Sequence, residues 1–269
     1  MNDQHTTFRI AGEIDVISLA HPVPGAGYLP IRSYLIRGRQ PVLIDTGAVA
    51  AARGFLEALE GLIDPSELEW IVLSHPDTDH SGGLPALLAK APRAKLVLNW
   101  VSTGKLSATI EPPMPRLRWV NAGESLAAGD RVLHFLRPPM YDCPSTVAIY
   151  DSKSRVLFSS DAFGAFVPEA TDTFAELKAP EATLEGMSFF CRANSPWLAD
   201  VRPDRYEAAL KSVVDLEPAW LLGGHLPAVG APDVGKIVGR AASFPAEGRV
   251  PLPGQQALDA ALAALAKAA

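Results

Sequence analysis

Short apolar runs alternate with polar turns along most of the chain, and this pattern predicts many short strands and several helices. The apolar runs at 70–74 and 219–222 have the length of buried strands, whereas residues 50–62 carry apolar side chains at helical spacing. Proline opens two further helical segments, 180–191 and 203–214, at a position where its missing N–H costs nothing. Other strands are expected at 14–19, 33–37, 41–45, 95–99, 131–136, 146–150 and 155–158, and other helices at 84–90, 233–242 and 255–269.

Turn signals divide these elements and mark one boundary near the end of the chain. The polar turn 151–154 separates two strand patterns and predicts a β-hairpin. Residues 248–254 are rich in proline and glycine and precede an alanine-rich helical segment. We therefore expect one domain at 1–246, followed at 247–269 by a linker and a C-terminal helix that packs on the core or on a second subunit. No repeat of fixed period is present.

Composition narrows the class of protein. The 269 residues are 48% hydrophobic and 20% charged, which is typical of a globular protein with a sizeable core. The net charge is −6 and no basic block occurs, so neither a nucleic-acid partner nor a membrane partner is expected. Two cysteines, Cys143 and Cys191, cannot form a disulfide framework, and no secretory signal is seen at the N-terminus. We expect a cytoplasmic protein.

The densest group of chemically active side chains follows the strand pattern at 70–74. The stretch HPDTDHSGG, residues 75–83, places two of the six histidines and two carboxylates within six residues. Glycines then lead into a helical segment. Imidazoles and carboxylates at the end of a buried strand are typical of a metal site, and a merely solvated polar turn would not explain the similar residues elsewhere.

Potential ligands recur after other predicted strands. Asp142, Asp161 and His225 each follow an apolar run, and Asp45 ends another strand in the same manner. Asp142 could instead be an ordinary turn residue and Asp45 an Asx-turn. His134 lies inside a strand pattern, so we expect it to be structural.

The pattern His75-x-Asp77-x-Asp79-His80 resembles the signature of the metallo-β-lactamase superfamily, and a carboxylate at its third position is typical of the flavodiiron subgroup. The segments LFSSDAFG at 157–164 and PMYDCPS at 139–145 resemble flavodiiron segments as well. The resemblance covers about residues 10–245. It implies an α+β fold, a four-layer αββα sandwich with the site at one edge.

The resemblance also implies seven metal ligands, divided between two ions. Asp79 and Asp161 would be the catalytic residues, Asp45 would orient a ligand imidazole, and Tyr141 would lie behind the ligands. One ion would be bound by His75, Asp77 and Asp142 and the other by Asp79, His80 and His225, with Asp161 bridging the two.

This chain departs from the subgroup in three respects. Position 77 is Asp rather than Glu, and position 142 is Asp where the subgroup has His. We also expect no flavin in this chain, because no flavodoxin-like domain follows and no phosphate-binding glycine loop is found. Either Asp142 binds metal directly or the first ion is held more openly than in the subgroup.

The donor set predicts the metal and a class of reaction. A set rich in carboxylates favours iron, with zinc or manganese as the alternative. We expect a non-haem di-iron protein that binds or reduces dioxygen or nitric oxide. Its electrons would come from a separate flavoprotein or rubredoxin, unless it is a sensor or carrier without turnover. The alternative is a dinuclear hydrolase of an ester, lactone, thioester or phosphodiester. A homo-oligomer is expected.

Overall fold

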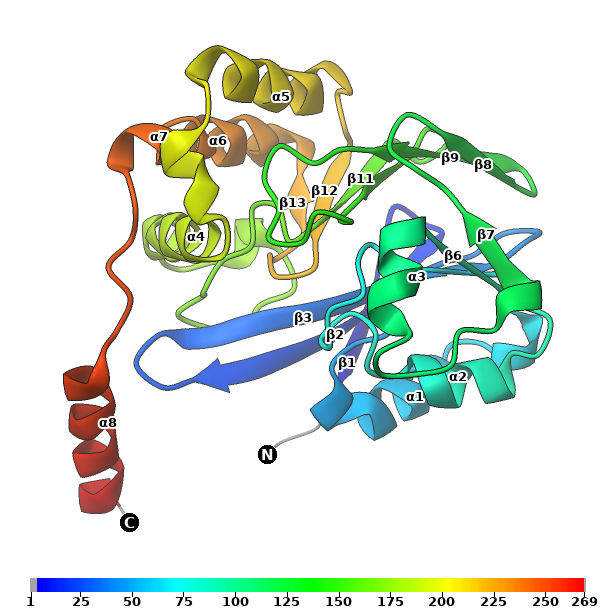
Figure 1. Cartoon of the computed structure of the whole chain (residues 1–269), viewed down its shortest axis with the longest axis horizontal. Helices are drawn as coiled ribbons and strands as arrows, with labels where there is room; N and C mark the ends of the chain where they lie inside the picture. The colour runs from blue at the N-terminus through cyan, green and yellow to red at the C-terminus, as the bar shows by residue number, and fades with distance from the viewer. Residues whose placement is uncertain (1–3, 269) are drawn as a thin grey trace.

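A computed structural model describes residues 4–268, and it shows two β-sheets packed face to face with helices on both outer faces (Figure 1). This is the four-layer αββα sandwich that the sequence predicted. Successive side chains along a strand point to opposite faces of its sheet, so one set packs between the two sheets and the other packs against the outer helices. In β4, Val42 and Ile44 pack between the sheets while Leu43 faces the outer helices. Strands buried on both faces read as continuous apolar runs, which is the pattern seen at 70–74.

The first sheet has seven strands in the order β1-β2-β3-β4-β5-β6-β7. Neighbours are antiparallel from β1 to β4 and parallel from β4 to β7. The parallel strands therefore end at one common edge. The strands are β1 Thr6–Ile10, β2 Ile14–Val23, β3 Gly27–Ile36, β4 Val42–Ile44, β5 Trp70–Val72, β6 Lys95–Leu98 and β7 Leu117–Trp119.

The second sheet has six strands in the order β13-β12-β11-β10-β9-β8. The pair β11 and β12 is parallel, and the remaining neighbours are antiparallel, including the β10–β11 hairpin that the turn at 151–154 predicted. The strands are β8 Ser125–Ala128, β9 Arg131–Leu136, β10 Ala148–Asp151, β11 Val156–Ser160, β12 Trp220–Gly223 and β13 Val229–Gly230.

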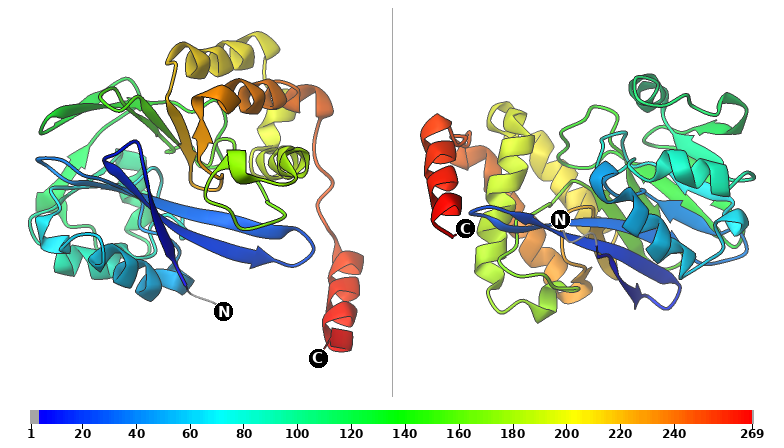
Figure 2. Two further views of the ribbon diagram at one scale, coloured as in Figure 1. Left: turned by 180° about the vertical axis from the view of Figure 1, so that it is seen from behind. Right: turned by 90° about the horizontal axis from the view of Figure 1, so that it is seen from below.

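Helices cover the outer face of each sheet. Side chains of α1, α2 and α3 pack on the first sheet, and those of α4, α5 and α6 pack on the second (Figures 1 and 2). The helices are α1 Ala52–Glu60, α2 Leu84–Lys90, α3 Trp100–Leu106, α4 Pro180–Asn194, α5 Pro203–Asp215, α6 Ala231–Ala241, α7 Phe244–Glu247 and α8 Gln255–Ala268.

A buried arginine ties the two sheets together at the edge opposite the ends of β4, β5 and β11. Arg131 at the start of β9 pairs with Asp151 (2.6 Å) and with Glu13 in the turn between β1 and β2 (2.5 Å), and it also donates to the carbonyl oxygen of Arg37. Buried ion pairs persist when every donor has a partner. Ion pairs therefore join the two sheets at this edge, and the candidate ligands lie at the opposite edge.

Several elements were missed from the sequence. The strand expected at 33–37 begins at Gly27, because β2 and β3 form one long hairpin whose far half carries prolines and polar residues. Helix α3 was missed because it is short and contains Gly104; Asn99, which was assigned to a strand, is its N-cap and accepts a hydrogen bond from the Ser102 N–H. The strands β1, β7 and β13 also escaped prediction.

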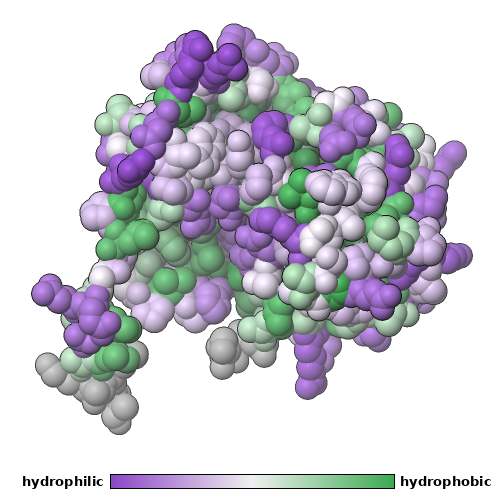
Figure 3. Space-filling view, in the orientation of Figure 1, coloured by the Kyte–Doolittle hydropathy of each residue, from purple (hydrophilic) through white to green (hydrophobic). Residues whose placement is uncertain are grey.

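The C-terminal helix α8 stands away from the sandwich at the end of the extended segment 248–254 (Figures 1 and 3). Leu258 and Leu262 are more than half exposed. The expected packing of this helix on the core is therefore not observed. Among residues 4–268, no helix has the length and apolar character needed to cross a membrane.

Candidate metal centre

The candidate ligands lie together at the edge where β4, β5, β11 and β12 end. His75 follows β5, Asp161 follows β11 directly, and His225 comes two residues after β12. Asp45 follows β4 directly. Side chains from both sheets can meet here because strands of both sheets terminate at this edge. The recurrence of ligands after apolar runs is thereby explained.

The loop that carries His75 to Gly83 is held rigidly against the segment after β4. The Thr46 N–H donates to the His80 carbonyl (2.7 Å), and the Gly82 N–H donates to the Gly47 carbonyl (2.8 Å). Within the loop, the amides of His80 and Ser81 both donate to the Asp77 carbonyl. The backbone thus turns sharply enough to bring its four ligand side chains toward one point.

The hydrogen bonds of two histidines define which ring nitrogen is free. His225 Nδ1 donates to the carbonyl oxygen of Pro30 (2.7 Å), and His80 Nδ1 donates to a carboxylate oxygen of Asp45 (2.8 Å). In a neutral imidazole the other nitrogen, Nε2, then carries a lone pair. The two Nε2 atoms lie 3.3 Å apart. Two lone pairs facing each other at that distance require a proton or a metal ion near them.

Carboxylates surround these nitrogens. Asp161 lies between the imidazoles: its Oδ1 is 2.9 Å from His80 Nε2 and its Oδ2 is 3.7 Å from His75 Nε2. Asp79 Oδ2 is 3.3 Å from His225 Nε2, and Asp77 Oδ2 is 3.8 Å from His75 Nε2. The two oxygens of Asp161 therefore face different imidazoles.

All seven predicted ligands are brought together by the fold. They form three overlapping groups whose donor atoms lie within 4.8 Å of one another and could hold a metal ion. Asp142 belongs to one group although its Oδ1 also accepts a hydrogen bond from the Cys143 N–H (2.6 Å), as a turn residue would. The groups are His75, Asp77 and Asp142; Asp79, His80 and His225; and His75, His80 and Asp161.

The donor set fits two divalent ions. His75 Nε2 is buried and lacks a hydrogen-bond partner among the described residues, and Asp161 Oδ1 is buried and close to His80 Nε2 without a well-aligned hydrogen bond to it. Buried polar atoms without partners are costly, and a cation between them would satisfy both. Four carboxylates balance the charge of two divalent ions. The arrangement therefore matches a carboxylate-bridged dinuclear centre.

The pKa values of the candidate ligands in the metal-free site reflect the close approach of imidazoles and carboxylates. Burial by itself raises the pKa of Asp161, but His75, His80 and His225 hold it well below its usual range. Burial likewise raises the pKa of Asp79, and a hydrogen bond from His225 reverses the effect. Burial lowers the pKa values of His80 and His225, yet Asp161 and its neighbouring carboxylates raise both above the usual value. Burial raises the pKa of Asp142, and Asp161 adds to the effect.

These shifts predict how the stability of the metal-free protein depends on pH. His80 and His225, with raised pKa values, stabilise the fold below about pH 6.5 and lose that contribution as the pH rises through their folded-state pKa values. Asp79 and Asp161, with lowered pKa values, contribute above about pH 4 and lose it as the pH falls. Metal-free protein should melt highest between about pH 4 and 6.5.

Thermal unfolding in chelator from pH 4 to 9 checks this expectation. When divalent metal is added in place of chelator, the melting temperature should no longer fall above about pH 7, because the metal replaces the protons on the imidazoles. A metal-free melting temperature that climbs steadily from pH 6 to 9 would contradict the assignment of the charges.

Sequence reasoning missed several residues behind the ligands. Ser74 and Ser160 both contact His75 Nδ1, at 3.2 and 3.1 Å, and the Pro30 carbonyl holds His225. Ser160 lies within the segment LFSSDAFG at 157–164, and each serine adjoins a predicted ligand, but neither was singled out from the sequence. Tyr141 was expected behind the ligands; its ring contacts Trp197. His134 lies on β9 near Tyr150.

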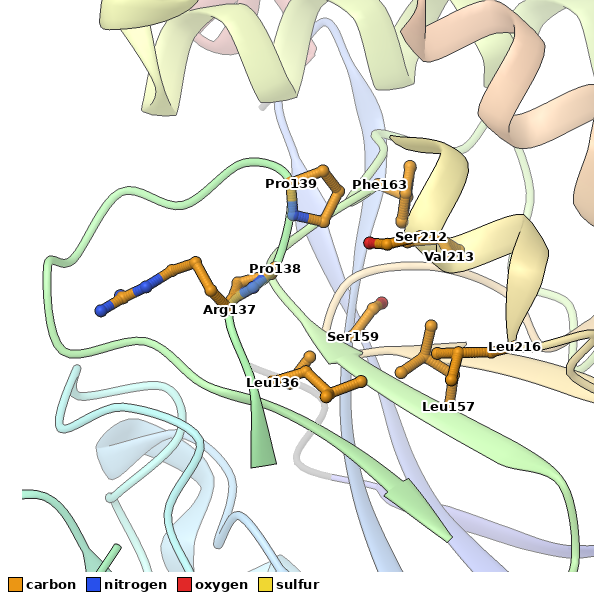
Figure 4. Close-up of a pocket in the computed structure, with 11 residues that line it drawn as sticks. Leu136, Arg137, Pro138, Pro139, Leu157, Ser159, Phe163, Ser212, Val213 and Leu216 are labelled. Carbon is orange, nitrogen blue, oxygen red and sulfur yellow. The ribbon is translucent and has the colours of Figure 1, made fainter. Parts of the chain in front are cut away.

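A separate apolar cavity lies behind the segment that carries Asp161. It has a volume of about 240 Å³ and is lined by side chains of β11, α5 and the segment after β9, including Leu157, Phe163 and Val213 (Figure 4). None of the seven candidate ligands lines it. The cavity is therefore distinct from the metal centre.

Comparison with known proteins shows the family of the chain. Residues 29–199 match the family model described as ODP family beta lactamase. The chain belongs to this family. Among curated relatives, it is 34% identical over 151 residues to the putative diflavin flavoprotein A 2 of a Nostoc species, which covers 56% of this chain and 26% of that protein. It is 32% identical over 133 residues to an anaerobic nitric oxide reductase flavorubredoxin of Pectobacterium atrosepticum, covering 49% and 26%.

Solved structures confirm the fold of this ODP-family protein. Rubredoxin:oxygen oxidoreductase of Desulfovibrio gigas superposes with a TM-score of 0.79 at 17% identity, covering 90% of this chain and 62% of that one. A fragment of diflavin flavoprotein A 5 from Nostoc superposes with a TM-score of 0.76 at 21% identity, covering 91% and 97%. These structures show that the chain has the same fold as they do. The matched region spans only about a quarter of the length of the curated relatives above.

Proposed function

We propose that this ODP-family protein is a non-haem di-iron protein that binds or reduces dioxygen or nitric oxide. The observation that carries the proposal is the cluster of three buried imidazoles and four carboxylates, with Asp161 between the two groups of donors. Oxygen-rich donor sets with a bridging carboxylate suit iron or manganese better than zinc. The names of its relatives, a nitric oxide reductase and an oxygen oxidoreductase, are consistent with this chemistry.

The residues would divide their roles as follows. His75, Asp77 and Asp142 would hold one ion, and Asp79, His80 and His225 the other. Asp161 would bridge them, and Asp45 would keep His80 oriented. Two ferrous ions would supply electrons and open coordination positions for a diatomic gas. Asp79 and Asp161 would be the catalytic residues.

Turnover would need electrons from outside the described cluster, and we propose a separate flavoprotein or rubredoxin as their donor. One structural neighbour is named for oxidising rubredoxin. Without such a donor the same centre would act as an oxygen sensor or carrier. Steady oxygen consumption with added rubredoxin and its reductase separates these two roles.

Metal analysis tests the proposal. Protein purified without oxygen should contain about two irons per chain, and its ultraviolet–visible spectrum should change on exposure to air and revert with dithionite. Two zincs per chain, no colour and no response to reductant would overturn the di-iron assignment. In that case the dinuclear hydrolase would be preferred, and lactones, thioesters and phosphodiesters would be the substrates to screen.

A further inference from the structure

Ser160 adopts a backbone conformation that is unfavourable for any residue with a Cβ. Its φ is +56°, in the left-handed region, and it directly precedes Asp161. Only glycine enters that region freely. Ser160 is also 4% exposed. Strain of this kind at a functional site is tolerated when the surrounding contacts over-determine the conformation, so the contacts of this side chain are informative.

The Ser160 hydroxyl joins a continuous chain of hydrogen bonds. It donates to Ser74 Oγ (2.9 Å) and lies 3.1 Å from His75 Nδ1. Ser74 Oγ in turn donates to Asp45 Oδ2 (2.7 Å), and the Ser74 N–H donates to Asp45 Oδ1 (2.8 Å). Asp45 also has a left-handed backbone, with φ +59°. Both strained residues thus belong to one network, which crosses between the two sheets.

The protons available in this network determine which ring nitrogen of His75 is protonated. An ionised carboxylate only accepts, so the Ser74 proton is committed to Asp45. With the Ser160 proton on Ser74, both hydroxyl oxygens can only accept from His75 Nδ1. That nitrogen then carries the imidazole proton, and Nε2 presents its lone pair toward the carboxylates. This is the tautomer that a metal ligand needs.

We infer that Ser160 is a positioning residue that fixes the tautomer and orientation of His75 and thereby sets the metal affinity of the group His75, Asp77 and Asp142. This group is singled out because His75 is its one imidazole. Neither imidazole of the other group contacts Ser160: His80 Nδ1 donates to Asp45, two hydrogen bonds further along the chain, and His225 Nδ1 donates to the Pro30 carbonyl. The inference rests on the proposed dinuclear centre but not on iron or oxygen chemistry.

Titration of metal-free protein with Co²⁺, followed by absorption and calorimetry, tests this role. Wild type should bind two ions. Ser160→Gly should weaken one step about 10- to 100-fold and leave the other within about threefold. Asp142→Ala should weaken the same step. Because glycine relieves the backbone strain, metal-free Ser160→Gly should melt within a few degrees of wild type.

Ser159 supplies the matched control. It is also buried, and its hydroxyl donates to the Ala162 carbonyl (3.0 Å) and forms no hydrogen bond with His75. Ser159→Ala should therefore leave both steps unchanged. A second comparison uses Ser74→Ala: if both serines act through one chain, the double variant Ser74→Ala/Ser160→Gly should bind no more weakly than the weaker single variant.

The outcomes separate the possibilities. Three results would each overturn the positioning role and leave the dinuclear centre standing. Ser160→Gly could bind at both steps as wild type does, it could weaken both steps equally, or the losses in the double variant could be fully additive. A wild-type protein that binds no Co²⁺ would overturn the dinuclear centre and the positioning role together.

Discussion

Replacing Asp161 with alanine should lower the metal content from about two ions to one or fewer per chain. The carboxylate is 7% exposed and faces both groups of donors, with oxygens 2.9 Å from His80 Nε2 and 3.7 Å from His75 Nε2. Without it, two cations would approach each other with no shared anion between them. The cluster would lose one negative charge. Among the described residues, Asp161 is the one carboxylate in the group that also contains His75 and His80. Loss of the bridge should also abolish any oxygen-dependent spectral change.

Elemental analysis of protein purified without oxygen measures this effect. Asp215→Ala is a suitable control, since Asp215 is an exposed aspartate on α5 that pairs with Lys211 and belongs to none of the three groups of candidate ligands. It should retain full metal content. Asp161→Asn preserves the shape but not the charge, and it should resemble Asp161→Ala if charge is what matters. Two ions per chain in either Asp161 variant would refute the bridging role.

Gly82→Ala should be the most destabilising single-methyl change in the ligand loop. A Cβ at this position would lie 2.1 Å from Val49 N and 2.2 Å from Ala48 C, both backbone atoms that no rotamer change can move. The loop would have to lift away from the segment after β4 and lose the hydrogen bond from the Gly82 N–H to the Gly47 carbonyl. We expect a loss of about 3 kcal/mol, which corresponds to a fall in melting temperature of roughly 10 °C.

The same loop carries His75, Asp77, Asp79 and His80, so metal should bind more weakly to Gly82→Ala as well. Gly104→Ala in α3 is the matched control. A Cβ there meets no atom within 4 Å, and alanine favours the helix, so stability should rise by about 0.5–1 kcal/mol. Thermal melts of both variants in chelator measure the difference. Equal melting temperatures for the two would show that the close packing at Gly82 is not required.

Much of the fold could be predicted because its apolar runs are short, well bounded and of the correct period. Strands β4, β5 and β12 are buried on both faces, and their uninterrupted apolar runs left few alternatives. The far half of the β2–β3 hairpin could not be predicted, since it is stabilised by its cross-strand pairing and by a bridge from Tyr28 to Val167 rather than by an apolar pattern. Helix α3 was missed for a related reason, as its start depends on the cap that Asn99 provides.

By itself, the sequence indicated which side chains the candidate centre would use. Four of them lie within six residues of one turn, Asp142, Asp161 and His225 follow other apolar runs, and resemblance to a family implied how the seven divide between two ions. Tertiary structure alone decided how those ligands are held. The contacts of Ser160 with His75 and of the Pro30 carbonyl with His225 join residues 85 and 195 positions apart. Such contacts form only when two separate sheets end at the same edge, and no local pattern of residues encodes that meeting.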